Sequence, residues 1–219
     1  MGRTKEEEAT LPLEIYYKGN YFSRDQLASF VTQIDTVAQC YPKTMLEVGK
    51  GNGFVSDYFR KAEVEVTTVD VNPVLQPDVC GSILDLTSLL NEKCYDVVLC
   101  AEVLEHLPLA EFDECLQQLA ASTAKNAILT LPSCMRSPID LGFTLKIPHL
   151  KRCYARMYLP LFRRAIASEH YWEIGSERET SMAAIKKRIA RYFKIERVFR
   201  EFTKSYHIFI VLRKRDDLD

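Results

Sequence analysis

A run of glycines with an acidic side chain at its start is the feature of this sequence with the clearest chemical meaning. Residues 47–53 read Glu-Val-Gly-Lys-Gly-Asn-Gly and stand between a short apolar segment and an amphipathic one. Glycines allow a tight turn and close approach of the backbone to a ligand, and the N-terminus of a following helix offers unpaired N–H groups. A dinucleotide-binding turn has its third glycine at the position that Phe54 occupies here. The spacing therefore disfavours a nicotinamide dinucleotide.

Further acids follow the next strand-like segments in chain order. Asp70 ends the segment Thr-Thr-Val-Asp, Asp85 lies in Ser-Ile-Leu-Asp-Leu, and Glu102 follows an apolar run. A carboxylate offers two oxygens, so an acid at the position of Asp70 can accept hydrogen bonds from both hydroxyls of a ribose. The alternative interpretation is that Asp70 and Asp85 only cap the elements beside them.

Two histidines are candidates for proton transfer. His106 lies in Val-Leu-Glu-His-Leu-Pro, and His170 lies in Glu-His-Tyr-Trp-Glu. Imidazoles titrate near neutral pH, so either side chain can take a proton from an attacking hydroxyl or amine. For His106 the alternative is a capping or packing role. For Trp172, packing in the core is favoured over a place in the wall of a substrate pocket.

Composition restricts the class of protein. The chain has 219 residues, 47% of them apolar, and its 29 basic and 30 acidic side chains leave a net charge of −1. This balance does not indicate a globally basic nucleic-acid binder. No apolar run approaches the ~20 residues that span a bilayer. Three acids near the N-terminus disfavour a signal peptide, and seven scattered cysteines without a Cys-x-x-Cys spacing favour free thiols. We expect a cytoplasmic protein with no metal site.

The elements that position these residues alternate between strands and helices. Strands are expected at 44–49, 64–70, 80–86, 95–101 and 126–132, helices at 23–38, 54–62, 86–91, 109–122 and 181–193, and two closing strands at 194–202 and 206–215. Such alternation predicts a three-layer α/β sandwich around a seven-stranded, mostly parallel sheet with an antiparallel last strand. We expect one domain over 1–219, with a helical cover (1–42), a core (43–132), a cap insertion (133–178) and a C-terminal helix and strand pair (179–219).

The segment 146–164 is the one place where charge is informative. It holds six basic residues and no acid, and Leu150, Tyr154, Met157 and Leu161 fall at helical spacing until Pro160 ends the helix. A solvated amphipathic helix packed on the domain is the favoured interpretation. The alternative is a lid that contacts an anionic substrate or the surface of a membrane.

The order of the motifs resembles that of the class I S-adenosylmethionine-dependent methyltransferases, of the type that modifies small molecules. The resemblance covers residues 44–132 and rests on the glycine turn, the acids after the second and third strands, and the sequence Ala-Glu-Val-Leu-Glu-His at 101–106. It implies that the acid after the second strand binds the ribose, that the acid after the third binds the adenine amino group, and that the acid after the fourth lies beside the methionine end. The residues that it implies as cofactor ligands are Glu47, Gly49, Gly51, Gly53, Asp70, Val71, Asp85, Leu86, Ala101 and Glu102.

The resemblance implies transfer of a methyl group from S-adenosylmethionine to an O, N or C nucleophile of a small molecule, which a glycan or lipid can carry. A nucleic-acid substrate is not expected, because the chain lacks an Asn/Asp-Pro-Pro-Tyr-type motif and has Ala101 and Glu102 there. Two alternatives are a non-catalytic, S-adenosylmethionine-binding regulatory or scaffold protein and, disfavoured by Phe54, a nicotinamide-dependent oxidoreductase. The acceptor atom, the use of a general base and the oligomeric state stay open.

Overall fold

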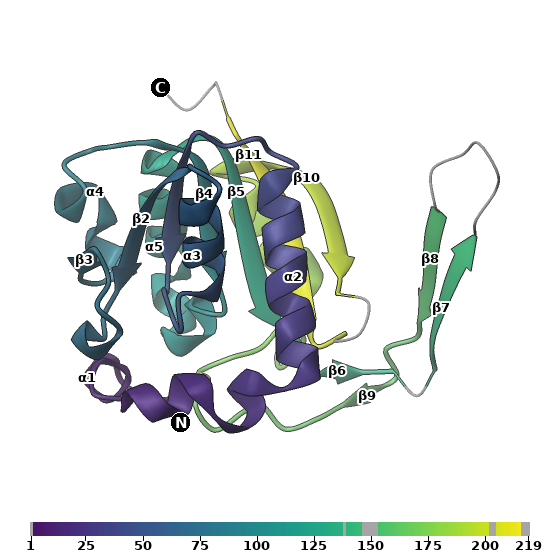
Figure 1. The fold of residues 1–219 in the computed structure, drawn as a ribbon. Helices are drawn as coiled ribbons and strands as arrows, with labels where there is room; N and C mark the ends of the chain where they lie inside the picture. Colours follow the sequence, from purple (N-terminus) through teal and green to yellow (C-terminus); the bar gives the residue numbers. More distant parts are fainter. Residues whose placement is uncertain (1, 138, 146–152, 202–204, 216–219) are drawn as a thin grey trace.

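A single sheet of seven strands forms the centre of the fold (Figure 1). The computed structural model describes residues 2–137, 139–145, 153–201 and 205–215. The sheet has the order β10-β11-β5-β4-β1-β2-β3, and β11 runs in the opposite direction to the other six strands. The strands are β1 (Thr44–Val48), β2 (Glu65–Asp70), β3 (Val79–Cys80), β4 (Tyr95–Ala101), β5 (Thr123–Pro132), β10 (Phe193–Arg200) and β11 (His207–Lys214). The predicted fold class is confirmed.

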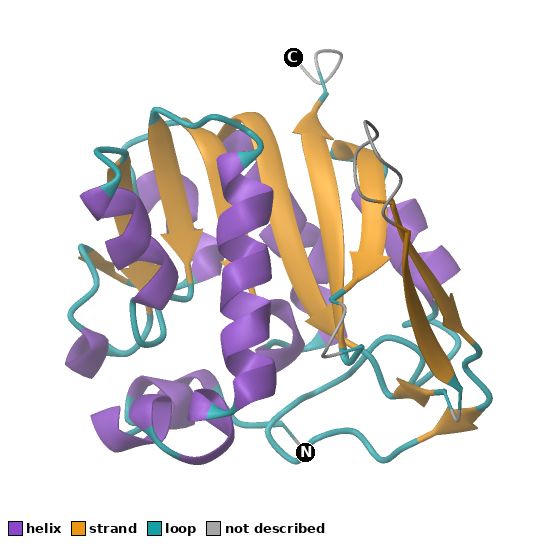
Figure 2. Cartoon of the chain, turned by 45° about the vertical axis from the view of Figure 1, so that its right-hand side comes forward, coloured by secondary structure: helices purple, strands orange, loops and turns teal. Residues whose placement is uncertain are grey.

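Helices cover both faces of this sheet and complete the predicted three layers (Figure 2). One face carries α2 (Arg24–Ala38) and α3 (Phe54–Lys61), and the other carries α4 (Leu86–Leu89), α5 (Phe112–Ala121) and α6 (Met182–Ile189). Successive residues of a strand point to opposite faces. Met45 accordingly packs in the cluster with α2 and α3, and the adjacent Leu46 packs in the cluster with α4, α5 and α6.

Short-range signals place several elements where the sequence predicts them. Ser23 caps α2, because its Oγ accepts a hydrogen bond from the backbone N–H of Gln26 at 3.2 Å. The strands β1 and β2 pair in parallel on either side of α3 in the chain, as a βαβ unit requires. The strand β4 coincides with the predicted apolar run 95–101.

The predicted strand at 80–86 is wrong beyond its first residue. The strand β3 ends at Cys80, and the 3₁₀ turn η4 (Ile83–Asp85) leads directly into α4. Ser82 caps this turn by accepting a hydrogen bond from the backbone N–H of Leu84 at 3.3 Å. Serine side chains compete with sheet pairing by bonding to the local backbone, so the chain leaves the sheet early.

The helix predicted within 146–164 is also wrong in the described part of that segment. Leu150 lies outside the described residues, but Tyr154 and Met157 lie on a strand, β8 (Cys153–Tyr158). This strand pairs antiparallel with β7 (Asp140–Leu145), which precedes it in the chain. A helix limited to about ten residues by Pro160 is marginal on its own, so strand pairing prevails.

The β7–β8 pair, termed the arm, extends away from the sheet (Figures 1 and 2). At its base β6 (Met135–Arg136) pairs with β9 (Phe162–Arg163). None of the described helices is both long enough and apolar enough to cross a bilayer.

The residues before α2 lie across the carboxyl ends of the parallel strands (Figure 1). They form α1 (Lys5–Ala9) and the 3₁₀ turns η1 (Leu13–Tyr17) and η2 (Gly19–Phe22). The backbone N–H of Arg3 donates to the carbonyl of Glu169 at 3.1 Å, so this N-terminal wall is joined to the segment that precedes α6.

Candidate active site

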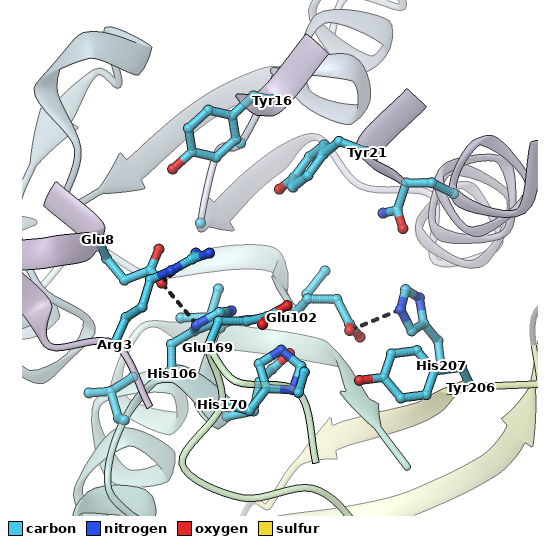
Figure 3. A pocket seen from close by; sticks show the side chains of 18 of the residues that line it. Arg3, Glu8, Tyr16, Tyr21, Glu102, His106, Glu169, His170, Tyr206 and His207 are labelled. Atoms are coloured by element: carbon cyan, nitrogen blue, oxygen red, sulfur yellow. Dashed lines mark hydrogen bonds and ion pairs between the residues drawn. The ribbon is translucent and has the colours of Figure 1, made fainter. Parts of the chain in front are cut away.

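A cavity of about 900 Å³ lies at the carboxyl ends of β1, β2 and β4 (Figure 3). The strand order reverses here, because β1 pairs with β2 on one side and with β4 on the other. Open α/β sheets bind their ligands at such a point. The N-terminal wall, the segment before α6 and the start of β11 also contribute lining residues.

Gly49 and Gly51 bring the backbone to the wall of the cavity. Both have left-handed φ angles, of 83° and 53°. A Cβ atom on Gly49 would lie 2.3 Å from Cγ2 of Val103, so a side chain does not fit there. A Cβ atom on Gly51 would lie 3.1 Å from the hydroxyl of Tyr21 in the N-terminal wall. The turn therefore keeps open the space between the sheet and this wall.

Asp70 ends β2 with its carboxyl group at the cavity. Its Oδ1 accepts a hydrogen bond from the backbone N–H of Asn72 at 2.9 Å, and its Oδ2 accepts one from Gly51 at 3.3 Å. Burial raises the pKa of Asp70, and these backbone hydrogen bonds oppose the rise. The next residue, Val71, lines the cavity as well. The carboxyl oxygens keep further lone pairs for ligand hydroxyls.

Glu102 follows β4 in a strained conformation, with a φ angle of 55°. Its Oε1 accepts a hydrogen bond from Thr130 Oγ1 at 2.8 Å, and its Oε2 lies 3.0 Å from Nε2 of His207. A carboxylate only accepts, so Nε2 of His207 carries a proton, and Nδ1 lies 2.9 Å from the hydroxyl of Ser29. These contacts fix the carboxylate of Glu102 within the cavity, beside Ala101 (Figure 3).

Two of the predicted ligand residues lie behind the glycine turn and do not line the cavity. Glu47 is buried on β1 on the side of α3, where burial raises its pKa to about 8 against the hydrogen bonding of Ser56. Gly53 is the N-cap residue directly before α3. Both positions support the turn from within the protein.

Asp85 and Leu86 also lie outside the lining of this cavity. Asp85 ends η4 and faces a separate depression, and Leu86 is fully buried in the core. Because β3 ends early, Ser82 and Ile83 line the cavity near these positions instead.

His106 and His170 lie edge to face in the cavity, with ring centroids 5.0 Å apart. Nδ1 of His106 lies 3.2 Å from Oε1 of Glu8, and Nδ1 of His170 lies 3.1 Å from Oε1 of Glu173. Because a carboxylate only accepts, Nδ1 of His170 carries a proton, whereas the contact of His106 with Glu8 lacks hydrogen-bond geometry. In the neutral form of either ring, Nε2 can present a lone pair. Figure 3 shows the pair formed by His106 and Glu8.

The carboxylates that orient these histidines are held in the charged form. Burial alone would raise the pKa of Glu8, but its contacts with His106 and Arg3 lower it overall. Burial likewise opposes the charge of Glu173, whose pKa is lowered by hydrogen bonds that include the one to His170.

Glu105, between Glu102 and His106 in the chain, is a residue for which the sequence analysis assigned no role. The side chain of Glu105 is fully buried and forms part of the cavity lining. Neither of its carboxyl oxygens has a hydrogen-bond partner of regular geometry among the described residues. Burial, and then the nearby Glu102 carboxylate, raise the pKa of Glu105 well above its usual value. The sequence signal for Glu105 was its place in the Glu-x-x-Glu-His pattern at 102–106, next to two residues already singled out.

The sequence of this chain matches a known protein family. A model of a family described as a methyltransferase domain matches residues 17–174, which is most of the chain. This chain belongs to that methyltransferase family. The match extends from the N-terminal wall to the segment of His170 and Glu173. No curated protein matches the sequence significantly.

Solved methyltransferase structures share the fold at low sequence identity. Magnesium protoporphyrin IX methyltransferase (ChlM) from Synechocystis, with S-adenosylhomocysteine bound, has 15% identity and a TM-score of 0.61 over 92% of each chain. The N-methyltransferase NodS from Bradyrhizobium japonicum has 10% identity and a TM-score of 0.59, over 93% of this chain and 97% of that one. The glycopeptide N-methyltransferase MtfA has 12% identity and a TM-score of 0.56, over 93% and 96%.

The cavity of this methyltransferase also contains residues for which the sequence carried no local signal. Arg164 pairs with Glu173 at 2.9 Å and lies over the ring of Tyr206, 4.2 Å from its centroid. The hydroxyl of Tyr206 donates to Glu173 as well, at 2.8 Å. These partners lie about 10 to 40 residues apart in the chain, so only the fold shows that they form one cluster.

Proposed function

We propose that this methyltransferase transfers a methyl group from S-adenosylmethionine to a small molecule. The observation that carries the proposal is the cavity at the strand-order reversal, where Gly49 and Gly51 leave the backbone open beside the carboxyl group of Asp70. A nucleoside fits this arrangement, because the turn admits its bulk and the carboxyl oxygens can accept from ribose hydroxyls. Crystals of the similar proteins ChlM, NodS and MtfA contain S-adenosylhomocysteine.

Different residues of the chain contact different parts of the cofactor in this proposal. Asp70 and Val71 take the ribose, and Ile83 takes the face of the base, with Asp85 and Leu86 adjoining from η4 and α4. Glu102 complements the positive charges of the methionine end. Bound S-adenosylmethionine supplies an electrophilic methyl group on a sulfonium sulfur.

The other end of the cavity is proposed to hold the acceptor. The similar proteins ChlM and MtfA are named for magnesium protoporphyrin IX and for a glycopeptide. The volume of about 900 Å³ lies in the range of roughly 300–1,000 Å³ of small-molecule sites. His106 and His170 present Nε2 lone pairs there, which can take the proton of an acceptor hydroxyl or amine.

Calorimetry with S-adenosylmethionine, S-adenosylhomocysteine and NADH tests the cofactor. We expect the first two to bind and NADH to give no heat; binding of NADH alone would reject the proposal in favour of an oxidoreductase. Incubation with methyl-labelled S-adenosylmethionine and a metabolite extract then tests catalysis. Cofactor binding without label transfer to any fraction would favour the scaffold alternative.

We propose further that the arm meets the anionic surface of a membrane. Leu141, Phe143 and Met157 are exposed, and the pairing of Leu141 with Met157 places all three on one face of the arm. The segment 146–164 adds six basic residues and no acid. Apolar side chains beside positive charge are typical of peripheral contact with anionic lipid.

The chain is proposed to act in the cytoplasm. Cys80 and Cys94 are exposed free thiols, and such thiols persist in a reducing compartment.

A further inference from the structure

Glu105, His106 and His170 bring three potential ligand atoms together on one side of the cavity. One atom from each residue lies within 4.8 Å of the other two. Bonds to a first-row metal ion are about 2.0–2.2 Å long, so ligand atoms around one ion lie about 3.5 Å apart. Side-chain rotations that shift these atoms by about an ångström would therefore complete a coordination sphere.

The carboxyl group of Glu105 lacks a compensating group in this arrangement. Its side chain is fully buried, and its two oxygens have no hydrogen-bond partner of regular geometry among the residues that the structure describes. The nearby carboxylate of Glu102 adds repulsion. A buried, charged carboxylate requires a hydrogen-bond donor or a cation nearby, and a metal ion held by the same three side chains would supply the cation.

The surroundings of the two histidines match those of metal ligands. Oε1 of Glu173 accepts a hydrogen bond from Nδ1 of His170 at 3.1 Å, and Oε1 of Glu8 lies 3.2 Å from Nδ1 of His106 without hydrogen-bond geometry. Metal-binding histidines typically donate their second ring nitrogen to a carboxylate, which fixes the tautomer and raises the basicity of the ligand nitrogen. Glu173 is itself fixed by Arg164 and Tyr206, at 2.9 and 2.8 Å.

We propose that Glu105, His106 and His170 form a binding site for a divalent transition-metal ion. Two imidazoles and one carboxylate favour ions such as Zn²⁺, Co²⁺, Mn²⁺ or Fe²⁺ over Mg²⁺ and Ca²⁺, which prefer oxygen ligands. This proposal differs from the sequence-based expectation of no metal site. His170 lies 64 residues after His106 in the chain, so the sequence alone does not show that these side chains meet.

Three protein ligands leave coordination positions open toward the cavity. The consequence for the acceptor rests on the proposed methyl transfer: a molecule with an oxygen donor, such as a phenol or a vicinal diol, is favoured there, since a bound cation lowers the pKa of a coordinated hydroxyl. His106 and His170 then act as ligands in place of proton acceptors.

Titration of the metal-free full chain with Co²⁺ tests the site without cofactor or acceptor. The chain is treated with a chelator, and binding is followed by calorimetry and by the visible absorption of Co²⁺, which distinguishes nitrogen and oxygen ligands from thiolates. We expect one Co²⁺ per chain, at least a 100-fold loss of affinity in His106→Ala and in His170→Ala, and a roughly 10- to 100-fold loss in Glu8→Gln. Asp57→Asn changes an exposed carboxylate of α3 away from the cavity and should keep the wild-type affinity.

Absence of Co²⁺ binding by the wild type, or an unchanged affinity in both alanine variants, overturns the proposal. If the alanine variants do not fold by circular dichroism, Glu105→Gln decides, because it removes the charge of the third ligand with little change of shape, and its wild-type affinity would equally reject the site. The outcome is separate from that of the proposed function: S-adenosylhomocysteine binding is measured on the same proteins and does not require the ion.

Discussion

Nε2 of His207 lies 3.0 Å from Oε2 of Glu102, so β11, the last strand along the chain, supports the residue that directly follows β4. Ser29 of α2 lies 2.9 Å from the other ring nitrogen of His207. Three elements from distant parts of the chain thus set the position of one cavity carboxylate. Its strained backbone makes this support necessary.

We expect His207→Ala to weaken the binding of S-adenosylhomocysteine about tenfold. A hydrogen bond to a charged group contributes about 1.5 kcal/mol, which corresponds to that factor. His207→Gln retains an N–H donor and should stay within about threefold of the wild type. Calorimetry measures both, and equal affinity of the alanine variant and the wild type would show that Glu102 does not depend on this support.

Gly49→Ala should abolish measurable binding of S-adenosylhomocysteine. The added Cβ would lie 2.3 Å from Val103, so the turn has to move into the cavity or open. Gly19→Ala is the matched control, since Gly19 has a similar φ angle of 61° but nothing within 4 Å of the added atom. We expect both variants to lose about 1 kcal/mol of stability from backbone strain, but only Gly49→Ala to lose the ligand. If both variants lose binding, the cause is a general loss of folding and not a change in the glycine turn.

Asp70→Asn should reduce the affinity for S-adenosylmethionine about 10- to 30-fold. The amide has one acceptor oxygen where the carboxylate has two, and it lacks the charge that strengthens hydrogen bonds from ribose hydroxyls. Asp57→Asn, on the exposed side of α3, changes charge by the same amount away from the cavity and should have no effect. The assignment of Asp70 fails if the two variants bind alike.

Stability should fall as pH rises, because of Glu47. The pKa of this buried carboxyl is raised from 4.5 to about 8, so the folded state retains a proton that the unfolded state releases above its lower pKa. Its contribution to stability is complete below about pH 4.5 and is lost as pH rises to about 8. The expected slope in this window is about 1.4 kcal/mol per pH unit.

Glu47→Gln is the control for this slope, because the amide does not titrate. Denaturant unfolding across the same pH window measures both proteins. We expect the variant to have the flatter profile and to exceed the wild type in stability at the alkaline end. Parallel profiles would contradict the protonated state of Glu47.

Phe143→Asp should reduce sedimentation of the protein with vesicles of anionic phospholipid by at least half. The ring of Phe143 is 59% exposed on the arm, and aspartate both removes apolar area and adds repulsion. Val31→Asp is the matched control, because Val31 is also 59% exposed but lies on α2. Equal sedimentation of the two variants, or none of the wild type, would remove the membrane proposal.

The sequence predicts those parts of the fold and site that depend on short stretches of chain. The apolar run that became β4, the cap at Ser23 and the glycine turn with Gly49 and Gly51 all have local causes, and each lies where it was expected. Asp70 follows from the same logic, because it ends a strand beside that turn.

Contacts across the chain carry no such local signal. Glu8 and Glu173 reach the two histidines only because the N-terminal wall and the segment before α6 meet over the strand ends. The helix predicted within 146–164 rests on apolar spacing over only a few residues. The structure of β8 is decided by pairing with β7, which lies earlier in the chain. The hydrogen bond from Leu84 to Ser82 likewise directs the chain out of the sheet after β3, and strand propensities of single residues do not predict such a bond.

The N-terminal wall has a consequence for turnover. Tyr16 and Tyr21 close the cavity from short turns whose other side chains are mostly exposed, and the backbone bond from Arg3 to Glu169 joins the wall to the opposite rim. Segments with few buried contacts separate from a fold more readily than strands do. We therefore expect that weakening this attachment changes the rate at which ligands enter and leave the cavity without altering any group that lines its floor.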